Sequence, residues 1–176
     1  MRYGVKLRMY LIGNAEKRTK ILVKNKVFRS VGKNFFFQPR IIPDEPQLIR
    51  FGDNVTVASD VTFVTHDVID KVLNNMGYDT RFGYYAAPIE IGNNVFIGCN
   101  VTILPNVKIG NNVIIAAGSI VSKDVKDNTV VAGNPAKEIG KFDAYVEHRK
   151  NINEALVYPG SEQEIKYLWD RFDVQK

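Results

Sequence analysis

Aliphatic residues recur at every sixth position from residue 91 to residue 121, and a second small or aliphatic residue follows four positions after each. An amphipathic helix repeats about every 3.6 residues and a single strand about every 2, so neither explains the pattern. A period of six suits short parallel strands joined by tight corners, and such repeats are typical of a parallel β-helix. The predicted inward positions are Ile91, Ile97, Ile103, Ile109, Ile115 and Val121, with the partners Val95, Val101, Val107, Val113, Ser119 and Val125.

Small residues mark the expected corners of this coil. Gly92, Gly98 and Gly110 directly follow three of the aliphatic anchors, and asparagines lie close by. Because glycine and asparagine tolerate a positive φ, we expect them to occupy the corners.

The same period extends upstream, with one interruption. Phe51, Val57 and Phe63 are six apart, but Phe63 and Ile91 are 28 apart, which is not a multiple of six. We therefore predict a loop over residues 67–87 that leaves one corner of the coil. Long loops on rigid scaffolds tend to carry function.

The two ends of the chain do not follow the period. Asn14 is a candidate N-cap for a short helix, and Ser161 with Glu164 forms a capping box for a C-terminal helix. That helix carries an apolar stripe, which we expect to pack on the coil or on a neighbouring subunit. Its members are Ile165, Leu168, Trp169 and Phe172. The organisation predicted is a single all-β domain over 1–176, with an N-terminal segment (1–26), a β-helix (27–135) and a C-terminal extension with its helix (136–176).

Composition narrows the class of protein. No apolar run approaches the roughly 20 residues of a membrane span, the N-terminus has no secretory pattern, and one cysteine excludes an internal disulfide. We therefore expect a cytoplasmic protein without stable membrane insertion. Residues 1–50 hold twelve Lys and Arg against three acids, whereas the remainder holds twelve against sixteen. The basic third is either a solvated face or attracts an anionic substrate or a membrane surface; no nucleic-acid-binding motif is present.

Few residues suit chemistry. The chain has two histidines: His66 lies directly before the predicted loop, and His148 lies in a charged stretch typical of the surface. A neutral imidazole is a natural general base for a hydroxyl nucleophile, so His66 is the catalytic candidate. Cys99 follows Gly98, and the role of a small residue at a tight corner explains it better than the role of a nucleophile. No cluster has metal-ligand spacing, so no metal is expected.

Several separate motifs occur in order: Thr65-His66-Asp67, residues 88–98 (PIEIGNNVFIG), residues 116–124 (AAGSIVSKD) and residues 133–137 (GNPAK). Together they make residues 30–140 resemble the hexapeptide-repeat acyltransferases, nearest to the maltose, galactoside, nodulation-type and polysaccharide O-acetyltransferases. The resemblance implies a left-handed parallel β-helix, a homotrimer with active sites between subunits, and acetyl-CoA as the donor. It also assigns the catalytic role to His66, and it assigns acetyl-CoA contacts to Cys99, Ala117, Ser122, Lys123 and Lys137. Phe96, which stands where relatives have tryptophan, joins the cofactor set.

Departures from the family pattern concern the acceptor. The acidic loop residue that orients the histidine in some relatives has no clear match, and Asp79 is the candidate. The polar pair that holds the sugar in galactoside enzymes aligns with Gln38 and Pro46, so a simple galactoside is not expected. The residues predicted to bind the acceptor are Gln38, Asp67, Tyr84 and Tyr85.

The prediction is an acetyl-CoA-dependent O-acetyltransferase. In it His66 activates a sugar hydroxyl, on a surface polysaccharide or its precursor, for direct attack on the thioester. Two alternatives stay open: an enzyme of the same fold that acetylates chloramphenicol or streptogramins, and a non-catalytic β-helix scaffold.

Overall fold

The computed structural model describes residues 3–152 and 160–174. The chain divides into two compact units, residues 1–143 and residues 144–176, and each is described by itself.

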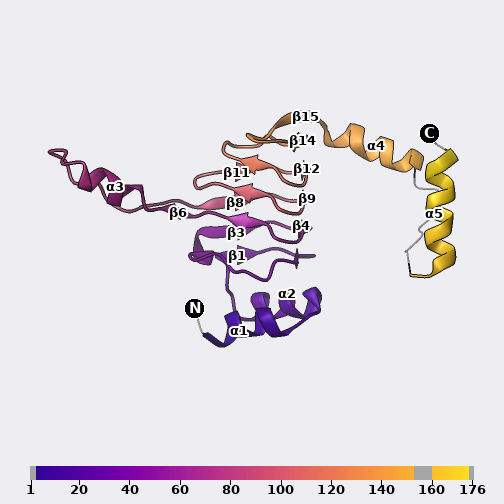
Figure 1. Ribbon diagram of the computed structural model, residues 1–176, viewed down its shortest axis with the longest axis horizontal. Coiled ribbons are helices and arrows are strands. Elements are labelled where there is room, and N and C mark those ends of the chain that lie inside the picture. Colours follow the sequence, from indigo (N-terminus) through magenta and orange to yellow (C-terminus); the bar gives the residue numbers. More distant parts are fainter. Residues whose placement is uncertain (1–2, 153–159, 175–176) are drawn as a thin grey trace. The chain divides into compact units, whose positions relative to one another are not determined.

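Three sheets wind into a coil in the first unit (Figure 1). Every strand pair within these sheets is parallel except β14 with β15. Sheet A contains β1 (Ser30–Val31), β3 (Ile49–Phe51), β8 (Ile89–Ile91) and β11 (Lys108–Ile109). Sheet B contains β2 (Phe36–Phe37), β4 (Val55–Val57), β9 (Val95–Ile97), β12 (Val113–Ile115), β14 (Thr129–Ala132) and β15 (Lys137–Lys141). Sheet C contains β5 (Thr62–Phe63), β10 (Thr102–Ile103) and β13 (Ile120–Val121).

Strand register explains the six-residue period. Glu90 pairs with Lys108, Val95 with Val113, and Thr102 with Ile120, so one full coil takes 18 residues, or three hexads. All twelve inward positions predicted from the sequence are buried, with exposed fractions of 8% or less. The repeat therefore predicted both the coil and its core.

Asparagines occupy the corners in the left-handed backbone region. Asn94, Asn100, Asn106 and Asn112 follow one another at the six-residue period, each with a φ between 54° and 63°. The glycines have another role, which corrects the sequence prediction. Gly92, Gly98 and Gly110 are not at positive φ, but a Cβ on each would lie 2.2–2.6 Å from atoms of the next coil. They are needed because neighbouring coils approach closely there.

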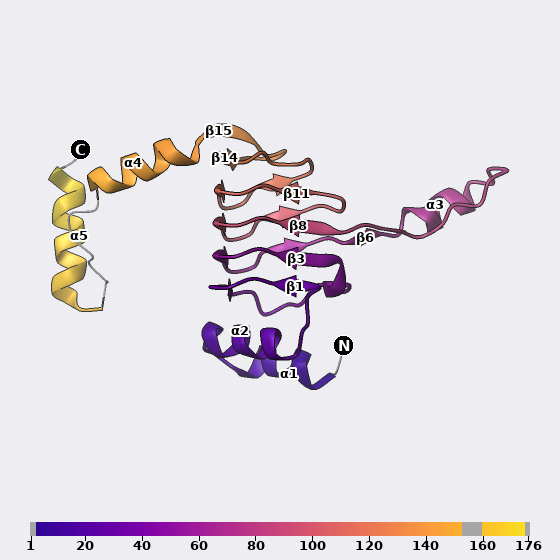
Figure 2. The same cartoon turned by 180° about the vertical axis from the view of Figure 1, so that it is seen from behind.

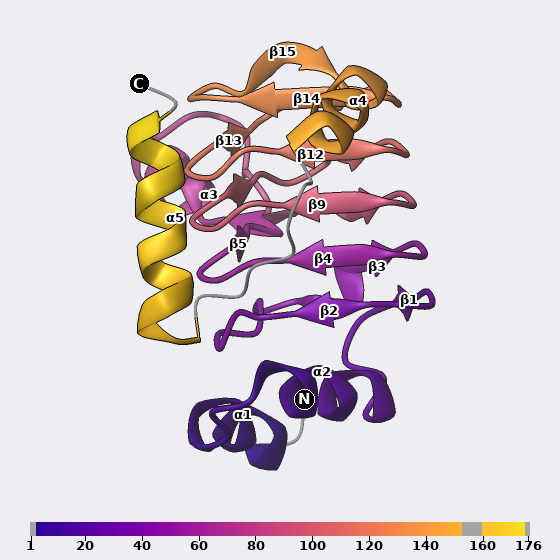
Figure 3. The same ribbon diagram turned by 90° about the vertical axis from the view of Figure 1, so that its right-hand side faces the viewer.

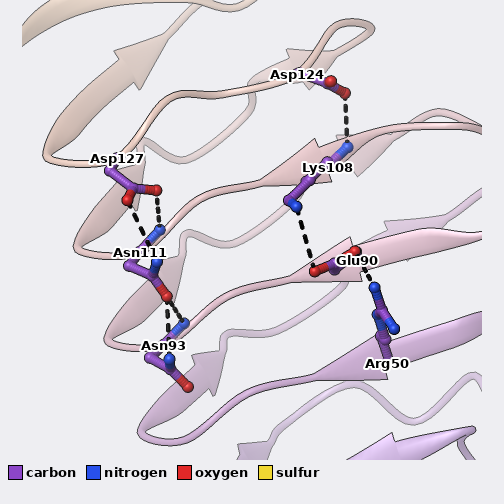
Figure 4. Close-up of polar contacts among 7 residues, drawn as sticks. All are labelled: Arg50, Glu90, Asn93, Lys108, Asn111, Asp124 and Asp127. Carbon is purple, nitrogen blue, oxygen red and sulfur yellow. Dashed lines mark hydrogen bonds and ion pairs between the residues drawn. The ribbon is translucent and has the colours of Figure 1, made fainter.

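Polar ladders tie the coils together along sheet A and its corner with sheet B (Figure 4). The backbone N–H of Asn93 donates to Asn111 Oδ1 over 2.8 Å, and the N–H of Asn111 donates to Asp127 Oδ1 over 2.7 Å. On the face of sheet A, Glu90 lies between Arg50, which donates to it, and Lys108, whose Nζ is 3.7 Å away. Each step of these ladders joins one coil to the next, so they add polar contacts to the apolar core.

Two helices lie across the first coil, where the coil begins (Figure 3). These are α1 (Tyr3–Leu11) and α2 (Ala15–Lys24). Asn14 caps α2, since its side chain accepts a hydrogen bond from the N–H of Lys17, as the sequence predicted. Met9 of α1 and Leu22 of α2 are fully buried, so the two helices close the apolar interior of the coil.

The predicted loop leaves the coil between sheets C and A (Figure 2). Strand pairing across it is offset by 40 residues, as in Val55 with Val95, which is 22 more than one coil. Its root is an antiparallel ribbon of β6 (His66–Asp67) and β7 (Tyr85–Ala86). It also contains α3 (Ile69–Asn75), which the sequence did not predict.

The second unit contains most of α4 (Phe142–Ile152) and all of α5 (Glu162–Val174). The predicted capping box is present, since the N–H of Glu164 donates to Ser161 Oγ over 3.3 Å. The four stripe residues of α5 keep exposed fractions of 38–61%, and their packing partner stays a prediction. The part of the predicted extension at 153–159 lies outside the described residues.

With five α-helices in the described ranges, the all-β class was too narrow: the coil is all-β, but its ends and its loop are helical. None of the described helices is both long and apolar enough to cross a membrane.

Candidate functional site

His66 is fixed at the root of the loop by the short ribbon and by a buried neighbour. It pairs with Ala86 across β6 and β7, and the N–H of Ala87 donates to the carbonyl of Thr65 over 2.9 Å. Thr65 is only 2% exposed, whereas the His66 side chain is 27% exposed. The backbone is therefore held while the imidazole stays accessible.

A carboxylate from the preceding coil meets this imidazole. Glu45 Oε2 lies 2.7 Å from His66 Nδ1 and accepts a hydrogen bond from the Thr65 hydroxyl over 2.6 Å. Its second oxygen, Oε1, accepts from the Tyr84 hydroxyl over 3.1 Å. Glu45 directly precedes the short 3₁₀ helix η1 (Pro46–Leu48), which leads into β3. One carboxylate thus joins the first coil to both sides of the loop root, at His66 of β6 and at Tyr84, which directly precedes β7.

Hydrogen bonding fixes the protonation of this cluster. The hydrogen bond from Thr65 lowers the pKa of Glu45 most; desolvation opposes it, and hydrogen bonds from His66 and Tyr84 assist it. An ionised carboxylate can only accept hydrogen bonds. His66 Nδ1 therefore carries a hydrogen and donates the hydrogen bond to Glu45. In a neutral ring with this arrangement the lone pair is on Nε2, which has no hydrogen-bond partner within residues 3–152 and 160–174. This tautomer is the one that a general base needs.

Tyr84 holds the other side of the imidazole. The two rings are stacked, with centroids 5.3 Å apart and an interplanar angle of 30°. Desolvation is the main cause that raises the pKa of Tyr84, and its hydrogen bond to Glu45 acts in the same direction. The phenol therefore stays protonated and donates to the carboxylate that orients His66.

The residues predicted to contact the acceptor divide between two corners. Asp67, Tyr84 and Tyr85 lie with His66 at the corner between sheets C and A, and Asp67 Oδ1 accepts from the N–H of Ile69 over 3.1 Å. Gln38 directly follows β2, at the corner between sheets B and C, and its carbonyl accepts from Arg18. The structure therefore brings three of the four together.

The residues predicted to contact acetyl-CoA are spread over sheet B and two corners of the coil. Cys99 and Ala117 are exposed on successive coils at the corner between sheets B and C. Ser122 and Lys123 are exposed directly after β13, at the corner between sheets C and A. Phe96 (β9) and Lys137 (β15) project from sheet B with their side chains exposed. No single corner of the chain gathers this set.

Glu45 is the site residue that the sequence reading missed. The offset between the first two coils is 20 residues, as in Ser30 with Arg50 and Phe36 with Thr56, and Glu45 precedes Thr65 by that same number. The 20-residue spacing of Val31 and Phe51 carried this signal. The prolines between 39 and 46 interrupt the hexad there and obscured it. Asp79, the acid suggested from the sequence, is exposed in the loop.

The described residues contain no group of three or more His, Cys, Asp or Glu side chains that is arranged to hold a metal ion.

Comparison with known proteins finds matches that include the coil. A family model described as bacterial transferase hexapeptide (six repeats) matches residues 88–123. Protein CapG of Staphylococcus aureus is 50% identical over 101 residues, which are 57% of this chain and 57% of that protein. The chain spans a little over half the length of the first curated relatives it matches.

Two solved structures share the fold. A maltose O-acetyltransferase from Clostridium difficile 630 is 31% identical with a TM-score of 0.57, over 78% of this chain and 82% of that one. A galactoside acetyltransferase in complex with coenzyme A is 29% identical with a TM-score of 0.61, over 90% of this chain and 83% of that one. These likenesses imply the left-handed β-helix that the sequence resemblance predicted. Because the repeat, the three-sheet coil and these matches agree, the chain belongs to the hexapeptide-repeat acyltransferase family.

Proposed function

We propose that this chain is an acetyl-CoA-dependent O-acetyltransferase that acts on a sugar hydroxyl, with a surface polysaccharide or its precursor as the acceptor. One observation carries the proposal. His66 Nδ1 donates to the Glu45 carboxylate, which leaves the Nε2 lone pair available at an accessible loop root. A β-helix that served only as a scaffold has no need for a buried threonine, a tyrosine and a carboxylate around one histidine.

The chemistry follows from this arrangement. Nε2 takes the proton from the acceptor hydroxyl as its oxygen attacks the thioester carbonyl, and the C–S bond then breaks. The leaving thiolate receives the proton from the imidazolium, so the histidine returns to its starting state. Glu45 stabilises the transient imidazolium and keeps the ring oriented. No covalent enzyme intermediate is required.

Features of the coil suit acetyl-CoA as the donor. The corner between sheets B and C carries small side chains at Cys99 and Ala117, next to Gly98 and Gly118. An extended pantetheine arm therefore has room to approach the backbone there. Lys123 and Lys137 are exposed and suit the phosphates. The solved galactoside acetyltransferase that resembles this chain is in complex with coenzyme A.

The separation of His66 from Cys99 and Ala117, which are predicted to contact acetyl-CoA, favours a homotrimer. His66 lies at the corner between sheets C and A, whereas Cys99 and Ala117 lie at the corner between sheets B and C. A closed rotational assembly brings such unlike corners of neighbouring copies together in every subunit. Light scattering at micromolar protein concentration tests this, and a monomer mass contradicts it.

Release of free thiol from acetyl-CoA, in the presence of a panel of saccharides and antibiotics, tests the function. The proposal expects turnover with a saccharide that disappears in His66→Ala. Turnover with chloramphenicol or a streptogramin instead identifies a xenobiotic acetyltransferase. If the protein neither binds acetyl-CoA nor hydrolyses it slowly, the scaffold reading is correct.

A further inference from the structure

The N-terminal cap, formed by α1 and α2 (residues 3–24), is held firmly on the first coil. Arg40 Nη1 donates to the carbonyl of Tyr10 over 2.9 Å, at the C-terminal end of α1. Arg18 Nη1 donates to the carbonyl of Ile12 over 2.9 Å, and its Nη2 donates to the carbonyl of Gln38 over 2.6 Å. Both guanidinium groups satisfy carbonyls where α1 ends, so the helix has a fixed orientation.

This orientation gives α1 two apolar faces. Val5 and Met9 point into the molecule, with exposed fractions of 5% and 0%. Leu7, Tyr10 and Leu11 lie on the opposite face at the i, i+3, i+4 spacing, with exposed fractions of 60%, 62% and 74%. The inner face explains the packing of the cap, whereas the outer face has no role in the fold.

A second element extends the outer face. Ile41, which is 71% exposed, lines the same surface hollow as Tyr10. At about 100° per residue, Lys6 and Arg8 fall on either side of the stripe led by Leu7. The exposed apolar side chains are therefore bordered by cations on both sides.

The surrounding charge is mainly positive, although Asp44 Oδ1 lies 4.0 Å from Lys6 Nζ. Residues 3–43 contain ten lysines and arginines against a single acid, Glu16. The adjoining helix α2 exposes Lys17, Lys20 and Lys24, and Figures 1 and 3 show α1 and α2 side by side across the end of the coil. Apolar and cationic side chains thus share the end of the molecule that faces away from the coil.

We propose that the N-terminal cap binds the surface of an anionic lipid bilayer. A helix with exposed Leu and Tyr side chains bordered by Lys and Arg inserts its apolar stripe at the headgroup boundary, while the cations meet anionic lipid. Within the cap itself Glu16 is the single acid that opposes this, against six lysines and arginines. An anionic polymer matches the charge but leaves Leu7 and Leu11 in water, so a bilayer fits both features together. The proposal stands apart from the acetyl-transfer chemistry at His66.

The rival occupant is helix α5 of a second copy. This helix carries the exposed stripe residues Leu168 and Trp169, and its four acids outnumber Lys166 and Arg171. An α5 helix on the cap produces self-association through the cap in the absence of lipid, beyond the proposed homotrimer, whereas a bilayer-binding cap does not need it. The two occupants are therefore separable by experiment.

Flotation of the full chain with vesicles tests the proposal. We expect binding to vesicles of phosphatidylcholine with phosphatidylglycerol, little binding to phosphatidylcholine alone, and a bound fraction that falls as salt rises. The double variant Leu7→Glu, Leu11→Glu should lower the partition coefficient at least about tenfold, because it removes both inserted leucines and adds like charge. Val72→Glu is the matched control, since Val72 is 62% exposed on α3 and lies outside the cap.

A second pair of variants tests the charge. Replacing Lys17, Lys20 and Lys24 with glutamine should lower binding several-fold and flatten its salt dependence. The same change at Lys71, Lys126 and Lys166 removes equal charge elsewhere and should have little effect. Failure of the native chain to bind anionic vesicles overturns the proposal. An equal loss of vesicle binding in a cap variant and in its control also overturns it. Self-association that Leu7→Glu and Leu168→Glu each abolish, without vesicle binding, assigns the cap to α5 instead.

Discussion

Glu45 Oε2 lies 2.7 Å from His66 Nδ1, although the two residues belong to successive coils and are 21 positions apart in sequence. The same oxygen accepts from Thr65, and the other carboxylate oxygen accepts from Tyr84, which also stacks on the imidazole. These contacts hold the ring in one orientation, with Nδ1 facing the carboxylate. In this pair His66 is the proposed catalytic base and Glu45 is its positioning residue.

Replacement of His66 with alanine should abolish turnover and leave acetyl-CoA binding intact. Loss of a general base typically costs about 10²–10⁴ in rate, and His66 is not among the residues expected to contact the cofactor. Steady-state kinetics and calorimetric titration with CoA measure the two effects. His148→Ala, the change at the only other histidine, is the control and should keep full activity. A fully active His66→Ala enzyme contradicts the assignment.

Changes at Glu45 should lower kcat without changing the KM for acetyl-CoA, because the carboxylate orients the base and does not touch the donor. Glu45→Gln keeps an oxygen that can accept from Nδ1, so it should retain more activity than Glu45→Ala, whose loss should be at least about tenfold. Asp44→Asn, at the neighbouring acid with a 74% exposed side chain, is the control. Equal losses in the Gln and Ala variants argue against a positioning role.

The same carboxylate should make stability depend on pH. Its pKa in the folded protein is lowered from an ordinary value of 4.5, chiefly by the Thr65 hydrogen bond. A group with a lowered folded pKa stabilises the folded state fully above its unfolded pKa, and this contribution is lost as pH falls through the folded value. Native protein should therefore exceed Glu45→Gln in free energy of unfolding at neutral pH, and the difference should shrink below pH 4.5. Urea titrations across this range measure it, and a difference that grows on acidification contradicts the expected sign.

The repeat made the core predictable, because a strict six-residue period determines which side chains point inward. Glu45 was not predictable in the same way, because the first coil has two extra residues and prolines that break the hexad. The glycines show a similar limit. Sequence marks Gly92 and Gly98 as special, but only the packing of adjacent coils shows that close approach, not positive φ, is the reason. Helix α3 was not predicted, although Ile69, Val72 and Leu73 have the i, i+3, i+4 spacing of a helix face; it spans only seven residues and contributes no buried residue to the core.

Gly98→Ala should destabilise the coil. A Cβ at Gly98 would lie 2.6 Å from the backbone nitrogen of Ala117 on the next coil, so the two coils must separate. Overpacking of this kind typically costs about 1–3 kcal/mol, which lowers the Tm of a domain this size by several degrees. Gly83→Ala is the control, because a Cβ there meets nothing within 4 Å and its φ is not positive. Equal thermal shifts in the two variants contradict this account.

Neutralising Lys123 or Lys137 should raise the KM for acetyl-CoA several-fold and leave kcat nearly unchanged. Both side chains are exposed near the last coils, at positions that the family resemblance assigns to the cofactor. A contact with the CoA phosphates is equally strong in the ground state and in the transition state, so its loss affects binding alone. Because water and ions screen an exposed pair, each lysine should contribute only about 0.2–1 kcal/mol.

Salt and donor structure separate this role from a general surface effect. Screening should reduce the difference between the native enzyme and Lys123→Ala as ionic strength rises. The difference should also fall with dephospho-CoA donors where the contact is to the 3′-phosphate. Lys126→Ala removes another exposed lysine three residues beyond Lys123 and should leave the KM unchanged. If Lys123→Ala and Lys137→Ala instead lower kcat at saturating acetyl-CoA with an unchanged KM, the donor lies elsewhere on the coil. The proposed pairing of His66 with a cofactor bound along these corners is then wrong.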